Sequence, residues 1–183
     1  MKKMSTTKCR LKTRMRELWE DHIKWTRNVI FCLVDNLPGT DQAVARLMQN
    51  QEDLGDILKP FYGEEVGDEF TRLLKEHIAI AAEVITATKA GNTDLIVQLD
   101  YKWTDNADQI ALFLCTKMPK LDCAEMKYMM RYHIKLTNDE ADFRINRMYD
   151  ADIDITNRLY REIRVMSDYL FQAIVKQFPQ EFI

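Results

Sequence analysis

The three histidines of the chain, His22, His77 and His133, stand in similar local sequences at an almost constant interval. Each follows apolar residues at positions −4 and −3 and is itself followed by isoleucine. The intervals of 55 and 56 residues predict that each histidine lies on a separate helix, with its ring turned toward an apolar core. Imidazoles gathered inside a helical bundle can bind iron, manganese or zinc.

A metal site in a helical protein also calls for a carboxylate. Asp152 is the best-placed acid because it interrupts the apolar stripe between Met148 and Ile155. Weaker candidates are Asp100, Glu140 and Glu162. The sequence therefore suggests a metal site made by His22, His77, His133 and Asp152, with the ligands arriving singly from separate helices.

In an alternative interpretation, the histidines bind no metal ion. None of them completes a Glu-x-x-His pair of the ferritin-like type, and none has a second metal-binding residue four positions later. In this interpretation each ring is neutral and hydrogen-bonded to a buried side chain such as Asp152, Asn50 or Asn106. The two buried amides would then fix the register of neighbouring helices.

Nucleophilic catalysis has no local support, because Cys115 and Cys123 are remote in sequence from every histidine. The residues therefore favour a non-enzymatic protein. Two functions remain: a metal-binding bundle, or a non-catalytic structural or protein-interaction bundle with hydrogen-bonded core histidines. Self-association or an unknown protein partner fits the second function, and the methionines Met126, Met129 and Met130 could pack against a partner helix.

Helical spacing of apolar residues predicts the elements that carry these side chains. Long helices are expected at about residues 11–35, 64–90, 93–118 and 138–178, with shorter helices at about 40–59 and 122–136. Gly91 marks one helix end, Asn92 or Thr93 and Asp122 are expected caps, and Thr137 with Glu140 has the spacing of a capping box. The predicted fold is all-α, an antiparallel up-down four-helix bundle, ferritin-like or hemerythrin-like in outline, with two additional short helices.

Length and charge define the predicted domain organisation. We expect one helical-bundle domain over residues 11–183, preceded by a basic, disordered leader at residues 1–10. Seven of the 26 basic residues lie within residues 1–16, which contain no acid. A basic arm can contact phosphates, but the rest of the chain is acidic, so nucleic-acid binding is not expected apart from the leader.

Cysteine usage and hydropathy indicate the compartment. The four cysteines form no CxxC pair, and Cys32 and Cys115 fall in apolar stripes, which predicts free thiols in a reduced, cytoplasmic protein. The longest apolar run, Val29 to Val34, is much shorter than the roughly 20 residues that span a bilayer. A soluble protein without a membrane span or signal peptide is expected.

Several segments together resemble a small uncharacterised bacterial all-helical family. They are Leu18 to His22, Trp25 to Arg27, Ala45 to Leu47, Leu58 to Gly63, Leu73 to Ile78, Lys89 to Thr93, His133, Leu136 to Thr137, Glu140 to Ala141 and Ile174 to Pro179. The resemblance covers nearly everything after Leu11 and implies a helical fold. Some members carry the label acetylglutamate kinase, but this chain has neither the GxGxxG nor the P-loop motif that would cradle ATP phosphates.

Overall fold

The computed structural model describes residues 6–183, and within that range all regular structure is helical. The long helices are α1 (Thr6–Asp35), α2 (Thr40–Asp56), α4 (Glu64–Ala90), α5 (Thr93–Lys117), α6 (Cys123–Ile145) and α7 (Tyr149–Gln177). A single turn, α3 (Lys59–Tyr62), joins α2 to α4, and the 3₁₀ helix η1 (Pro179–Phe182) follows α7. The predicted all-α class is confirmed.

The predicted boundary near Thr137 is wrong. Instead of capping a new helix, Thr137 donates its hydroxyl to the carbonyl oxygen of His133 at 3.0 Å, and α6 continues to Ile145. The chain turns only afterwards, where Arg147 takes a left-handed φ of 59°. As a result α6 has 23 residues and α7 has 29, in place of the expected short fifth helix and very long last helix.

Three helix ends lie where the sequence predicted them, those marked by Gly91, Asn92 and Asp122. Asn92 accepts a hydrogen bond from the Leu95 amide at 3.2 Å, and Asp122 accepts from the Ala124 amide at 2.8 Å. Gly91 has φ 67°, a left-handed conformation that costs glycine little and ends α4. These caps satisfy backbone groups that a helix terminus leaves without an intrahelical partner.

The structure describes only part of the predicted disordered leader at residues 1–10. Residues 1–5 of the predicted disordered leader lie outside the described residues. Residues 6–10 form the first turns of α1.

Among the helices described, none combines the length and apolar character that a bilayer crossing requires.

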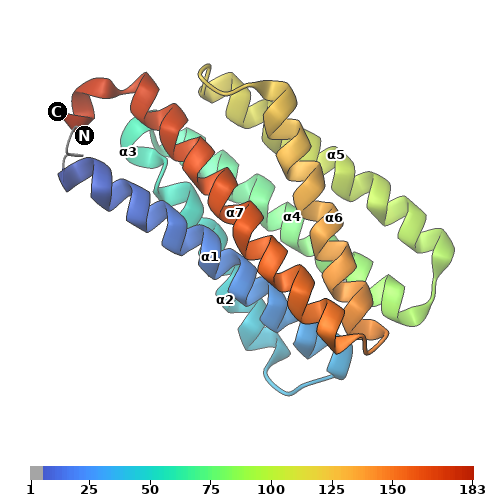
Figure 1. Ribbon diagram of the computed structural model, residues 1–183. Helices are drawn as coiled ribbons and strands as arrows, with labels where there is room; N and C mark the ends of the chain where they lie inside the picture. The colour runs from blue at the N-terminus through green and yellow to red at the C-terminus, as the bar shows by residue number, and fades with distance from the viewer. Residues whose placement is uncertain (1–5) are drawn as a thin grey trace.

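The long helices form three antiparallel hairpins, α1–α2, α4–α5 and α6–α7 (Figure 1). Each hairpin packs on the next through α2 with α4, α5 with α6, and α7 with α1, so the ring closes on itself. The first helices of the hairpins, α1, α4 and α6, also contact one another. His22, His77 and His133 lie on these three helices. The interval between successive histidines therefore equals the number of residues from one hairpin to the next.

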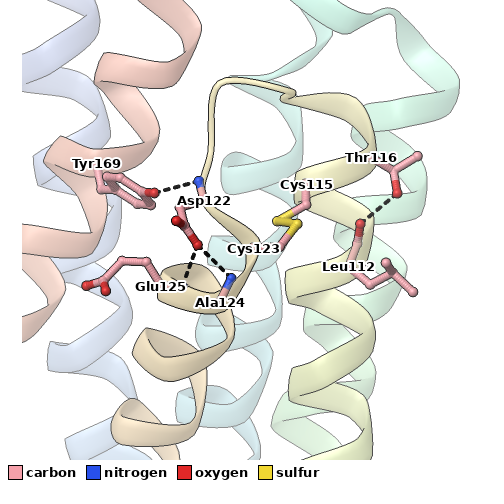
Figure 2. Close-up of a disulfide and its surroundings, with 8 residues drawn as sticks. All are labelled: Leu112, Cys115, Thr116, Asp122, Cys123, Ala124, Glu125 and Tyr169. Carbon is pink, nitrogen blue, oxygen red and sulfur yellow. Dashed lines mark hydrogen bonds between the residues drawn. A yellow bond between two sulfur atoms is a disulfide. The ribbon is translucent and has the colours of Figure 1, made fainter.

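Two cysteines that were expected to be free are joined. Cys115, near the end of α5, forms a disulfide with Cys123 at the start of α6 (Figure 2). The expectation failed because the turn between α5 and α6 brings residues eight positions apart to a Cα separation of 5.7 Å. Cys9 and Cys32 are free thiols. Beside the disulfide, the Asp122 amide donates to the Tyr169 hydroxyl at 2.7 Å, which ties this turn to α7 (Figure 2).

Candidate functional site

The three histidine rings are withdrawn from water, as predicted. His22, His77 and His133 keep only 3, 3 and 4 % of their surface exposed. The rings of His22 and His133 lie with their centroids 5.5 Å apart across the contact between α1 and α6. The structure therefore brings two of the three predicted ligands directly together.

His133 is held by Glu162, a carboxylate on α7. The His133 Nδ1 atom lies 3.0 Å from Glu162 Oε2, and both side chains are more than nine-tenths buried. A carboxylate oxygen can only accept, so a neutral His133 carries its proton on Nδ1 and keeps a lone pair on Nε2. The other oxygen of Glu162, Oε1, is buried without a hydrogen-bond partner.

His22 faces two buried amides of α2. Gln51 Nε2 lies 3.4 Å from His22 Nδ1 and also donates to the Leu47 carbonyl at 2.8 Å and to Asn50 Oδ1 at 3.2 Å. The two N–H groups of Gln51 are shared among these three acceptors, and the contact with His22 is the longest. Because an amide nitrogen cannot accept, we assign His22 Nδ1 as the acceptor and place the ring proton on Nε2. Asn50 in turn donates to the Leu18 carbonyl at 3.0 Å, which fixes the register of α2 against α1 as expected.

His77 has partners for both ring nitrogens. The Trp103 indole donates to His77 Nε2 at 3.1 Å, so His77 Nδ1 carries the proton and donates to Asn106 Oδ1 at 2.7 Å. Asn106 also donates to the Leu73 carbonyl at 3.2 Å, as Asn50 does to that of Leu18. In this tautomer His77 has no lone pair left for an ion.

A single rule describes all three environments. The Nδ1 atom of each histidine meets a polar side chain 29 residues later, which lies on the second helix of the same hairpin: Gln51, Asn106 and Glu162. At His77 the second helix of the hairpin contacts both ring nitrogens, because Trp103 on α5 donates to Nε2. At His133 the side-chain hydrogen bond found among residues 6–183 is made through Nδ1, to Glu162.

Burial lowers the pKa of two of the imidazoles, those of His22 and His77. The pKa of His22 is lowered well below its ordinary value, first by burial and then by the charges that His133 and His77 would carry. The pKa of His77 falls to about 3, again through burial first and His133 second. These three rings are within electrostatic reach of one another, and protonating one opposes protonating the next.

Asp152, the predicted fourth ligand, lies in a different cluster. Its carboxylate binds Arg27 through Nη1 at 2.6 Å and Nη2 at 3.1 Å. The same guanidinium contacts Glu140 and Thr156, so these acids join α1, α6 and α7 through an arginine. Asp100 is on α5 with Oδ1 buried and unpartnered. Of the four acids considered, Glu162 is the one in contact with a histidine.

As the side chains stand in residues 6–183, no three histidine, cysteine, aspartate or glutamate side chains are grouped to hold a metal ion. The rings of His22 and His133 lie 5.5 Å apart, whereas His77 is hydrogen-bonded to Trp103 and Asn106. A groove of about 470 Å³ between α6 and α7 reaches Glu162 and is lined also by Tyr128, Tyr132, Arg158 and Arg161. It leads from the surface toward the carboxylate that holds His133.

Comparisons with models of protein families, with curated proteins and with solved structures gave no match. The site is therefore interpreted from its own geometry. Sequence reasoning identified all three histidines but missed Gln51, Trp103 and the leading role of Glu162. The missed signal is the common 29-residue offset, which a search for polar residues at equal distances from each histidine would have found.

Proposed function

We propose that this chain is a helical-bundle protein, ferritin-like or hemerythrin-like in outline, that binds a transition-metal ion between α1, α4 and α6. His22 and His133 are the primary ligands through Nε2, and His77 joins them when Trp103 moves away. The observation that carries the proposal is the shared orientation of the rings, each with Nδ1 against a side chain of its own hairpin.

Such outer partners are what metal-binding histidines require. A histidine ligand usually hydrogen-bonds through its second nitrogen to a carboxylate or amide, which fixes the ring and its tautomer. Glu162 supplies this group to His133 and takes the carboxylate role that the sequence suggested for Asp152. His22 must move its proton from Nε2 to Nδ1 on binding, which gives the unpartnered Gln51 Oε1 a donor if the amide turns over.

The ligand set also restricts the ion. Neutral imidazoles are suitable ligands for zinc and iron. They are less suitable for manganese, which prefers oxygen ligands. The low pKa values of His22 and His77 mean that binding releases little or no proton from these rings at neutral pH. The bound ion would supply a positive centre in the core, and we assign no reaction to it.

A second function is favoured by a specific observation. Every histidine already has a polar partner of its own, and His77 has one for each nitrogen. This supports a non-catalytic structural or protein-interaction bundle in which the histidines only satisfy hydrogen bonds. Its partner would be another protein or a second copy of the chain.

Elemental analysis separates the two functions. Untagged protein is dialysed against zinc, iron(II) or manganese(II) and then against metal-free buffer, and bound metal is measured per chain. We expect close to one equivalent of one ion, lost in His22→Gln and His133→Gln. Glu125→Gln, a groove acid outside the histidine contacts, serves as the control and should retain the ion. Less than a tenth of an equivalent in the parent chain would leave only the second function.

A further inference from the structure

The groove between α6 and α7 has the composition of a small-molecule site. One wall comes from α6, with Tyr128, Met129 and Tyr132, and the other from α7, with Arg158, Arg161 and Glu162. Its volume of about 470 Å³ falls in the range of roughly 300–1,000 Å³ that small-molecule pockets occupy. Glu125 and Val165 complete the lining, so the walls combine an aromatic surface with two arginines and two carboxylates.

The aromatic wall is already ordered for stacking. The rings of Tyr128 and Tyr132 lie one helical turn apart, with centroids 5.9 Å apart and planes 4° from parallel. Tyr128 is 62 % exposed, although an aromatic side chain gains free energy when apolar surface leaves water. An aromatic ring placed on this wall would cover surface that the protein itself leaves open.

The cationic wall has no internal partner. Neither Arg158 nor Arg161 forms an ion pair or a hydrogen bond with another of residues 6–183. Arg164, on the same helix, instead binds Glu20 of α1 at 2.6 Å. A guanidinium presents paired N–H donors that match the oxygens of a carboxylate or phosphate. Two unpaired arginines at one groove therefore favour an anion.

Glu162, on the α7 wall, connects the groove to the core. Glu162 lines the groove with a side chain that is only 8 % exposed and with Oε1 lacking any hydrogen-bond partner. A buried acceptor without a donor costs about 1–3 kcal/mol, and because a carboxylate only accepts, a ligand could contact it only through a hydrogen-bond donor and not through its anionic group. Glu162 Oε2 meanwhile contacts His133, which connects the groove to the core histidines.

We propose that this groove binds a small aromatic anion, with the ring on Tyr128 and Tyr132 and the carboxylate or phosphate on Arg158 and Arg161. The inference goes beyond metal binding and does not depend on it. Because Glu162 joins the groove to His133, an occupied groove changes the environment of the His133 ring. Carboxylate and phosphate share the chemistry that the arginines recognise, and the probes below distinguish them.

The test uses the full chain in EDTA, so that failure of metal binding cannot affect it. Benzoate, phenyl phosphate, benzyl alcohol and benzylamine are titrated by calorimetry. At least one of the two anions should bind roughly tenfold or more tightly than benzyl alcohol, and the tighter anion identifies the group recognised. Arg158→Gln and Arg161→Gln should each weaken that anion by roughly tenfold, whereas Arg164→Gln, on the same helix, should change it less than twofold.

A second readout links the groove to the core. In protein labelled with ¹⁵N-histidine, the preferred anion should shift the Nδ1 resonance of His133 and leave that of His77 in place. The proposal is overturned if benzyl alcohol or benzylamine binds as well as both anions. It is also overturned if the Arg158 and Arg161 variants behave like the Arg164 variant, or if the His133 resonance does not move at saturation.

Discussion

Arg27 binds Asp152 with both terminal nitrogens of its guanidinium, at 2.6 and 3.1 Å, in the part of the molecule where α1, α6 and α7 meet. It also contacts Glu140, whose carboxyl has a raised pKa, chiefly because it is buried. One arginine therefore contacts two acids that are 0 and 2 % exposed, and Arg144 Nη1 also lies 3.9 Å from Asp152 Oδ2. This pairing explains why Asp152, which breaks an apolar stripe in the sequence, stabilises the fold without touching a histidine.

Removing the arginine alone should be costly. Arg27→Met leaves Glu140 without its cation and Asp152 with only the longer contact to Arg144 at 3.9 Å, and breaking a buried ion pair in this way costs about 3–5 kcal/mol. The free energy of unfolding in urea should fall by that amount. Adding Glu140→Gln and Asp152→Asn should restore most of it, because the remaining groups are neutral. Arg72→Met removes only exposed ion pairs and should cost less than about 1 kcal/mol. Equal losses in the two single variants would contradict this account.

Stability should fall on mild acidification because of the buried histidines. The pKa of His77 is about 3 in the folded chain and has an ordinary value of 6.5 when unfolded. The unfolded chain therefore takes up the proton first, and stability present above pH 6.5 is lost as the pH falls toward 3. Each such histidine contributes up to about 1.4 kcal/mol per pH unit, and the lowered pKa of His22 acts in the same direction.

Urea unfolding between pH 7 and 5 measures this dependence. Asp108 and Asp168, with pKa values lowered by arginine partners, titrate below this window and do not mask it. His77→Gln should be less pH-dependent than the parent chain over the same range. An identical slope in both proteins would mean that His77 is protonated equally in the folded and unfolded states.

Trp103 should control access to His77. Trp103→Phe keeps a ring in the core but removes the donor to His77 Nε2, at a cost of about 1–3 kcal/mol in unfolding free energy. The freed nitrogen should tighten zinc binding, measured by calorimetry, by roughly tenfold. Trp25→Phe is the matched control, because its indole nitrogen has no hydrogen bond to lose. Unchanged zinc affinity in Trp103→Phe would show that His77 does not join the site.

The disulfide between Cys115 and Cys123 can be tested by counting free thiols. Protein purified without reductant and denatured should titrate two thiols, Cys9 and Cys32, and two more after reduction. Because Cys115 and Cys123 are only eight positions apart, closing so short a loop stabilises the fold by about 2–3 kcal/mol in the chain-entropy description. The Cys115→Ala, Cys123→Ala double variant should lose that amount. Four thiols before reduction would contradict the pairing.

The sequence predicted helix ends best where a single residue determines the local backbone conformation or caps the helix. Gly91, Asn92 and Asp122 each act locally, and each lies where it was expected. Thr137 and Glu140 have capping-box spacing but do not cap a helix. The Thr137 hydroxyl instead donates to the His133 carbonyl of its own helix, and Glu140 pairs with Arg27. The turn at Arg147 contains neither glycine nor proline, so nothing local announced it.

The candidate site was likewise predictable where local sequence decides and not where helix packing decides. Histidine burial was readable from the periodicity, since each ring falls in an apolar stripe. Whether Asp152 or Glu162 would meet a ring depends on the phase of α7, which shifted when its start moved from about residue 138 to Tyr149. The disulfide depended on the shape of a turn and was not readable from cysteine spacing. Only the packing of whole helices decided these contacts.

The most direct test of the account is ¹⁵N NMR of the imidazole nitrogens, because the chain has three histidines and gives three spin systems. Without metal, His77 and His133 should carry their proton on Nδ1 and His22 on Nε2. One equivalent of zinc should shift Nε2 of His22 and His133 and move the His22 proton to Nδ1. If all three spectra stay unchanged at saturating zinc, the core histidines bind no ion and serve only as hydrogen-bonding groups.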